Sequence, residues 1–360
     1  MNLFFELVQV ALGNREMLSR VPSVCEWDQI DSEAQRQAVS GIIVDGLDKL
    51  PEAQLPKRHF LLRLVGDAEM IRQRNQVLNK RCIEIQQLFA DAGFRSCVLK
   101  GQGNAQMYPN PTSRMPGDID LWVDGERKAI NTFVDQIVKD AHKGYKDVAF
   151  HYKDVEVEAH YFPTYLNGYS KNKLLQNYIE ENKEAQFTHK VGIGEGHELC
   201  VPTDDFNVVY QMCHIYLHFF CEGIGLRHFI DYYFVLKRFV DIEEIKLKSI
   251  QQFQELGLLR FVMGVMWIEK EVLGLSDDYL LVEEDEKTGK MLLKEILEYG
   301  NFNKADMKGK SVAASKLSNT FRPFKYLFQF PKDSIDRLLF HGRLLLWKAK
   351  STISESLLVR

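Results

Sequence analysis

The chain has 360 residues, the length of about two domains. Charged residues make up 27% of it and hydrophobic residues 45%, as in ordinary soluble globular proteins, and the net charge of −4 argues against a dedicated nucleic-acid-binding protein. No segment approaches the roughly 18 uninterrupted apolar residues of a membrane helix, and the N-terminus lacks the features of a signal peptide. We therefore expect a cytoplasmic protein whose six cysteines are reduced and buried.

Helical patterns open and close the chain, with a mixed region between them. Apolar residues recur at helical spacing through the first part, including a long segment from about 60 to 90 that Gly93 is suited to end. From about 94 to 162 short apolar runs alternate with an amphipathic stretch over 125–140, which predicts intermixed strands and helices. After Pro202 the pattern is helical again, around 226–240, 244–272 and 287–299.

Acidic residues interrupt the apolar runs of this middle region. In GDIDLWV, Asp118 and Asp120 lie two residues apart, so their side chains share one face of the predicted strand. The runs DVAFHY and DVEVEAHYF predict a hairpin whose second strand presents Glu156, Glu158 and His160 on one face. If that strand pairs beside GDIDLWV, three carboxylates meet. Such a set favours one or two hard ions, Mg²⁺ or Mn²⁺, and phosphoryl or nucleotidyl transfer.

A glycine turn precedes the acidic strand. In VLKGQGN, Gly101 and Gly103 follow a predicted strand, where a missing side chain lets backbone amides approach a phosphate, and Lys100 adds a positive charge. The sequence contains no GxxxxGK[ST] motif, so this is not a P-loop. The turn and the carboxylates together predict a site for a metal ion and a phosphate group of a substrate.

The order LKG, DIDLWV and VEVEAHYF resembles the nucleotidyltransferase superfamily of the polymerase-β type, and more narrowly a little-characterised bacterial nucleotidyltransferase family. The resemblance implies that Gly101 begins the superfamily's glycine-serine motif, that Asp118 and Asp120 bind the metal, and that Glu158 is the third acid. Glu156 remains the alternative third ligand. Gln102 stands where the motif usually has its serine.

The resemblance implies an α+β fold with a small mixed-sheet nucleotidyltransferase core. We expect three regions: N-terminal helices over 1–78, the core over 79–202, and a C-terminal helical region over 203–360. The implied activity is metal-dependent transfer of a nucleoside monophosphate from a nucleoside triphosphate to an acceptor hydroxyl, with release of pyrophosphate. A small-molecule acceptor is favoured over nucleic acid. A nucleotide-binding protein without turnover, suggested by Gln102, and a kinase-like phosphotransferase are the alternatives.

Further candidates lie around this core. Arg114, in the proline-rich loop before the acidic strand, contacts either a substrate phosphate or a surface acid. His160 is a candidate for the substrate pocket because it lies next to the acidic face. In the helical half, His218, Arg227 and Asp231 are also candidates for the substrate pocket, and this part of the chain resembles the same family.

These helical residues also have simpler interpretations. Arg227 and Asp231 have the i, i+4 spacing of a helix salt bridge. His214 and His218 have the spacing of two zinc ligands, but no third ligand is evident, so His214 is interpreted as a structural histidine.

The C-terminal segment is basic, with twelve Lys or Arg against four Asp or Glu in residues 301–360. A helical pattern in SIDRLLFHGRLLLWKAK could bind an anionic membrane surface or nucleic acid. We favour a helix that packs on the protein body, with its lysines and arginines covering the outside.

Overall fold

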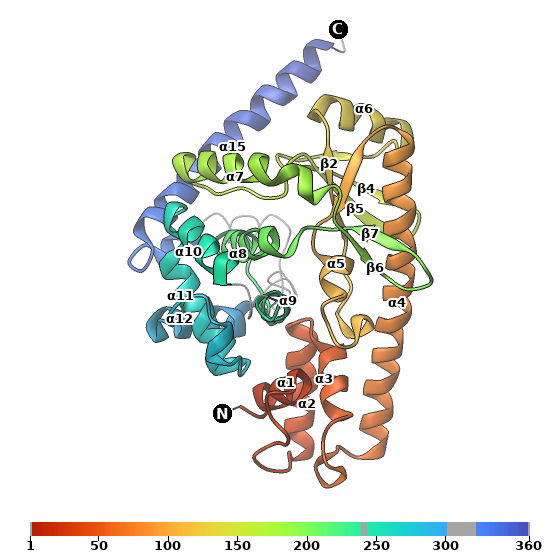
Figure 1. Cartoon of the computed structure of the whole chain (residues 1–360), viewed down its shortest axis with the longest axis vertical. Helices are drawn as coiled ribbons and strands as arrows, with labels where there is room; N and C mark the ends of the chain where they lie inside the picture. The colour runs from red at the N-terminus through yellow and green to blue at the C-terminus, as the bar shows by residue number, and fades with distance from the viewer. Residues whose placement is uncertain (1, 239–242, 301–321, 359–360) are drawn as a thin grey trace.

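The computed structural model describes residues 2–238, 243–300 and 322–358. Figure 1 shows N-terminal helices at one end, a sheet with its covering helices at the other, and the C-terminal helices beside both. The predicted α+β class is confirmed, since a five-stranded mixed sheet lies among helices. Among the described helices, none combines the length and the apolar character needed to cross a membrane.

The N-terminal region consists of three short helices and the start of a long one. They are α1 (Leu3–Leu12), α2 (Val24–Arg36), α3 (Ser40–Leu47) and α4 (Arg58–Asp91). The predicted long helix is confirmed by α4, which packs first against α3 and then against β1 (Arg95–Val98). Gly93, with φ of 84°, follows its end as predicted. Because α4 passes residue 78 without a break, it joins the N-terminal helices to the sheet. The domain boundary there stays a prediction.

The sheet has the strand order β1-β2-β5-β4-β3, in which β2 and β5 are parallel and the other neighbours antiparallel. Its remaining members are β2 (Ile119–Asp124), β3 (His142–Lys143), β4 (Asp147–Tyr152) and β5 (Val155–His160). The predicted hairpin is confirmed by β4 and β5. The predicted helix over 125–140 is α6 (Arg127–Ile137), which ends early because the backbone of Val138 is extended.

The two faces of the sheet meet different surroundings because side chains alternate along a strand. Ile119 and Leu121 of β2 face α4 and α6 and share one hydrophobic core with them. Trp122, on the opposite face, lies 4.7 Å from the Phe187 ring, measured between centroids, and also stacks on Phe206 of α8 (Asp204–Cys221). Asp120 therefore points toward the helical half of the protein.

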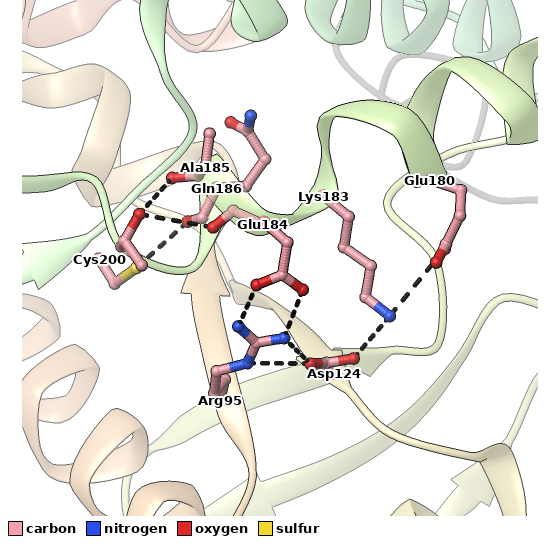
Figure 2. Close-up of polar contacts among 9 residues, drawn as sticks. Arg95, Asp124, Glu180, Lys183, Glu184, Ala185, Gln186 and Cys200 are labelled. Atoms are coloured by element: carbon pink, nitrogen blue, oxygen red, sulfur yellow. Dashed lines mark hydrogen bonds and ion pairs between the residues drawn. The ribbon is translucent and has the colours of Figure 1, made fainter.

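Ion pairs at the sheet edge hold α7 (Tyr169–Gln186) beside β1 and β2 (Figure 2). Arg95 lies between Asp124 of β2 and Glu184 of α7, with Nε 3.0 Å from Asp124 Oδ2 and Nη1 2.6 Å from Glu184 Oε2. Lys183 reaches the same aspartate, Nζ to Oδ1, at 2.6 Å. Arg95 and Glu184 are exposed and Asp124 and Lys183 are only partly buried, so each pair contributes only about 0–1 kcal/mol and mainly orients α7.

The C-terminal half is helical, as predicted. After the hairpin of β6 (Lys190–Gly192) and β7 (Glu198–Cys200) come α8, α9 (Leu226–Leu236), α10 (Glu243–Glu255), α11 (Leu259–Trp267), α12 (Glu286–Tyr299) and α15 (Pro331–Leu358). The predicted helix over 244–272 is divided near Gly257, whose φ of 63° turns the chain. Residues 239 and 240 of the predicted helix 226–240 lie outside the described residues.

Short segments of other helix types complete the chain. The 3₁₀ segments are Glu52–Gln54, Pro111–Ser113, Asp277–Tyr279 and Arg322–Tyr326, and Ile268–Val272 is π-helical. A five-residue helix, α5 (Gly101–Ala105), follows β1. All six cysteines are free; Cys25 is exposed, so the expectation that all are buried is wrong for it.

The basic C-terminal helix packs only in part. Asp333 of α15 binds Lys171 at 2.7 Å, and Phe340 is buried. Leu339 and Leu346, however, are 58% and 66% exposed. The predicted outer face made of lysines and arginines is therefore wrong at these two positions. Residues 301–321, and the side chains from residue 348 on, lie outside the described residues.

Candidate active site

Asp120 and Glu158 lie side by side on the two parallel strands. The register of β2 and β5 pairs them directly, and both face the helical half. His160, two residues further along β5, places Nε2 3.0 Å from Asp120 Oδ1 and 3.4 Å from Glu158 Oε2. One ligating atom from each of the three residues lies within 4.8 Å of the others. The convergence predicted for these strands is thus present. Glu156 is exposed and lies outside the cavity described below.

Asp118 precedes β2 and remains exposed, unlike Asp120, which is buried. The negative charge of Asp120, followed by desolvation, raises the pKa of Asp118. A raised pKa means that the ionised form of Asp118 is unfavourable beside its neighbour. A cation shared by the two carboxylates would remove this repulsion, so their electrostatics suit a metal ion.

Basic side chains already touch the carboxylates. Lys100 Nζ lies 2.8 Å from Asp120 Oδ1, and Lys146 Nζ lies 3.1 Å from Glu158 Oε2. Burial would raise the pKa of Asp120, but Lys100 and His160 hold that pKa well below its ordinary value. Burial is likewise outweighed at Glu158, where His160 and Lys146 lower the pKa to about 2. Both acids are therefore ionised at neutral pH.

Only one of the two predicted glycines lies beside the acidic strand. Gly101 has a φ of +51°, and a Cβ placed there would lie 3.7 Å from the Asp118 carbonyl oxygen. Gly103 lies away from the cavity, because a Cβ there would meet Val201 Cγ1 at 3.0 Å. Gln102 is buried, and its amide donates hydrogen bonds toward α4 at the Asn75 carbonyl and Asn79. No hydroxyl replaces the motif's serine at this position.

Arg114 and Asp231 form a buried ion pair between the loop before β2 and α9. Arg114 Nε and Nη2 donate to the two carboxylate oxygens at 2.8 Å each, and the Tyr108 hydroxyl donates to Oδ1 at 2.6 Å. Asp231 is 2% exposed, so the interpretation of Arg114 as pairing with a surface acid is wrong. The helix salt bridge predicted between Arg227 and Asp231 is also not formed, since Arg227 Nη1 donates to the Met115 carbonyl at 3.2 Å.

One face of α8 supplies the opposite wall. His214 is buried, and its Nε2 has no hydrogen-bond partner among the described residues, whereas the ring nitrogens of a structural histidine are normally hydrogen-bonded. Burial, and then Lys100, holds the pKa of His214 well below its ordinary value, so the imidazole is neutral. His218 Nδ1 lies 3.2 Å from Glu222 Oε2. The ring of His228, from α9, lies 5.6 Å from that of His214.

These histidines do not form a zinc site as they stand. In the described part of the chain, the group able to hold a metal is Asp120, Glu158 and His160, and the α8 histidines are not in it.

Most of these groups surround one cavity of about 170 Å³ between the sheet and helices α8 and α9. Every predicted site residue except Gly103 lines it, namely Lys100, Gly101, Arg114, Asp118, Asp120, Glu158, His160, His218, Arg227 and Asp231. Sequence reasoning missed Lys146, Tyr210, Glu222 and His228, which line it too. Of these, only Lys146 carried a signal, because it directly precedes the predicted hairpin strand.

Acidic side chains on neighbouring strands of a small mixed sheet, next to a glycine turn, define a nucleotidyltransferase-like protein. Residues 23–274 match the family described as "Uncharacterised nucleotidyltransferase", and the chain belongs to that family. It is also similar to the crystal structure of an antigenic nucleotidyltransferase-like protein from Paracoccidioides brasiliensis, with 12% identity and a TM-score of 0.32, over 49% of this chain and 88% of that one. A comparison with curated proteins gives no match.

Proposed function

We propose that this protein transfers a nucleoside monophosphate from a nucleoside triphosphate to an acceptor hydroxyl and releases pyrophosphate. The observation that carries this proposal is the direct pairing of Asp120 with Glu158 in a cavity that also contains Asp118 and Gly101. Family membership supports the class of reaction. The net charge of −4 favours a small-molecule acceptor over nucleic acid.

The donor atoms suit a hard divalent cation. Asp118, Asp120 and Glu158 offer carboxylate oxygens, which are the ligands that Mg²⁺ prefers and Mn²⁺ accepts, and the raised pKa of Asp118 reflects a repulsion that such an ion would relieve. When bound, the ion would supply positive charge to the triphosphate.

The protein's own groups account for the remaining steps. Gly101 leaves room for the polyphosphate at the turn. The ammonium of Lys100, which contacts Asp120, can instead contact a phosphate oxygen when the nucleotide binds. The acceptor oxygen then forms a bond to the α-phosphorus while the bond to the bridging oxygen of the β-phosphate breaks. Glu158, with a pKa of about 2, is a weak base and accepts the hydroxyl proton only as the new bond makes that proton acidic.

The test is pyrophosphate release from each of the four nucleoside triphosphates, with Mg²⁺ or Mn²⁺ and fractions of cell extract as the acceptor source. Glu158→Gln should abolish release, whereas Glu156→Gln, on the same strand but outside the cavity, should retain it. The product should gain the mass of a nucleoside monophosphate. Full activity in Asp120→Asn would contradict the proposal, and a product heavier by one phosphate would indicate the kinase-like alternative.

A second candidate is nucleotide binding without turnover. It is favoured by Gln102, whose side chain faces α4 and leaves the glycine turn without a hydroxyl for the phosphates. Calorimetry with the four nucleotides, with and without Mg²⁺, distinguishes the two. Tight binding with no pyrophosphate release from any acceptor fraction would favour the second candidate.

A further inference from the structure

Lys146 is anchored at the acidic site by contacts on two sides. Its Nζ lies 3.1 Å from Glu158 Oε2 and 3.3 Å from Asp147 Oδ2. Its backbone carbonyl accepts a hydrogen bond of 2.9 Å from the Tyr161 amide, which continues the ladder between β4 and β5. Both the main chain and the ammonium group of Lys146 are therefore fixed beside Glu158.

Lys100, the other lysine of the cavity, is held differently. Among the described residues its ammonium forms an ion pair only with Asp120. Lys100 also directly precedes Gly101, so the phosphates of an incoming nucleotide can compete with Asp120 for its ammonium. Lys146 keeps a second partner in Asp147, which does not line the cavity and so is not available to a ligand.

We propose that the ammonium group of Lys146 takes the place of a second divalent cation at Glu158, so that the site binds one divalent ion, at Asp118 and Asp120. This inference rests on the proposed function. Sites with two metals hold the ions about 3.5–4 Å apart, and Glu158 lies directly across from Asp120, where the second ion would bind. His160 and Lys146 both contact Glu158 Oε2. A second divalent cation bound at Glu158 would therefore be repelled by the Lys146 ammonium only a few ångströms away.

The experiment counts bound Mn²⁺ by electron paramagnetic resonance, at saturating α,β-methylene ATP, which cannot release pyrophosphate. The wild-type chain should bind one Mn²⁺ per nucleotide complex. Lys146→Met should bind a second Mn²⁺ at concentrations at least about tenfold below those at which the wild type still binds only one, because the competing charge is gone. Lys146→Arg keeps the charge and should bind one ion. Lys143→Met removes a surface lysine paired with Asp135 and should also bind one.

Two ions in the wild-type chain, or one ion in a folded Lys146→Met variant, would overturn this inference and leave the proposed function standing. The wild-type count decides even if Lys146→Met fails to fold. Absence of both Mn²⁺ and nucleotide binding in the wild type would contradict the inference and the proposed function together.

Discussion

The buried pair of Arg114 and Asp231 allows a prediction about whether these residues hold the fold. Both side chains are almost fully buried, and three hydrogen bonds converge on the Asp231 carboxylate from Arg114 and Tyr108. Asp231→Ala leaves the guanidinium buried without a counter-charge. Removing one partner of such a pair costs about 3–5 kcal/mol, so we expect that loss in the free energy of unfolding.

Companion variants separate the contributions. Tyr108→Phe removes one hydrogen bond to a charged acceptor and should cost about 1.5–3 kcal/mol, because Arg114 still neutralises Asp231. Replacing Arg114 and Asp231 together by Met and Leu should cost less than the sum of the single changes, because no unpaired charge remains. Glu184→Ala breaks a pair with the largely exposed Arg95 and should cost less than about 1 kcal/mol.

Urea denaturation followed by circular dichroism measures each free energy of unfolding, without metal or nucleotide. A loss below about 1 kcal/mol in Asp231→Ala would refute the reasoning from burial. In that case Asp231 would not hold the fold, and a weaker affinity of the same variant for nucleotide would assign it to the substrate instead.

Three further predictions concern the cavity itself. Gly101→Ala and Gly13→Ala should each cost about 1–2 kcal/mol of stability because both glycines have positive φ and open space, but only the first should weaken nucleotide binding in calorimetry. Asp118→Asn should leave metal-free stability at pH 7 unchanged or higher, because it relieves repulsion from Asp120, and should weaken Mn²⁺ binding at least about tenfold. Folding lowers the pKa of Glu158 from the ordinary 4.5 to about 2, so its ionised form stabilises the folded protein. In denaturant titrations, wild type should therefore be more stable than Glu158→Gln above pH 4.5, by at most about 3 kcal/mol, and this difference should disappear as the pH falls toward 2. A pH-independent difference would contradict this last prediction.

Local patterns in the sequence were enough to locate most of the candidate site. Period-two alternation predicts the hairpin of β4 and β5 and the inward position of Glu158, and the glycine turn predicts Gly101 next to the acidic strand. These predictions succeed because they depend on residues only a few positions apart. Gly103, in contrast, lies outside the cavity because it packs against Val201, which is distant in the sequence.

Other features were decided only by the tertiary structure. Glu158, and not Glu156, meets Asp120 because of the register between β2 and β5, which alternation within one strand does not specify. Asp231 binds Arg114, 117 residues away, where helical spacing favoured Arg227. The sequence by itself determined which side chains share a face, because backbone geometry is local. Only the packing of the sheet against α8 and α9 decided which charges meet, because a buried charge pairs with whichever opposite charge the fold brings to it.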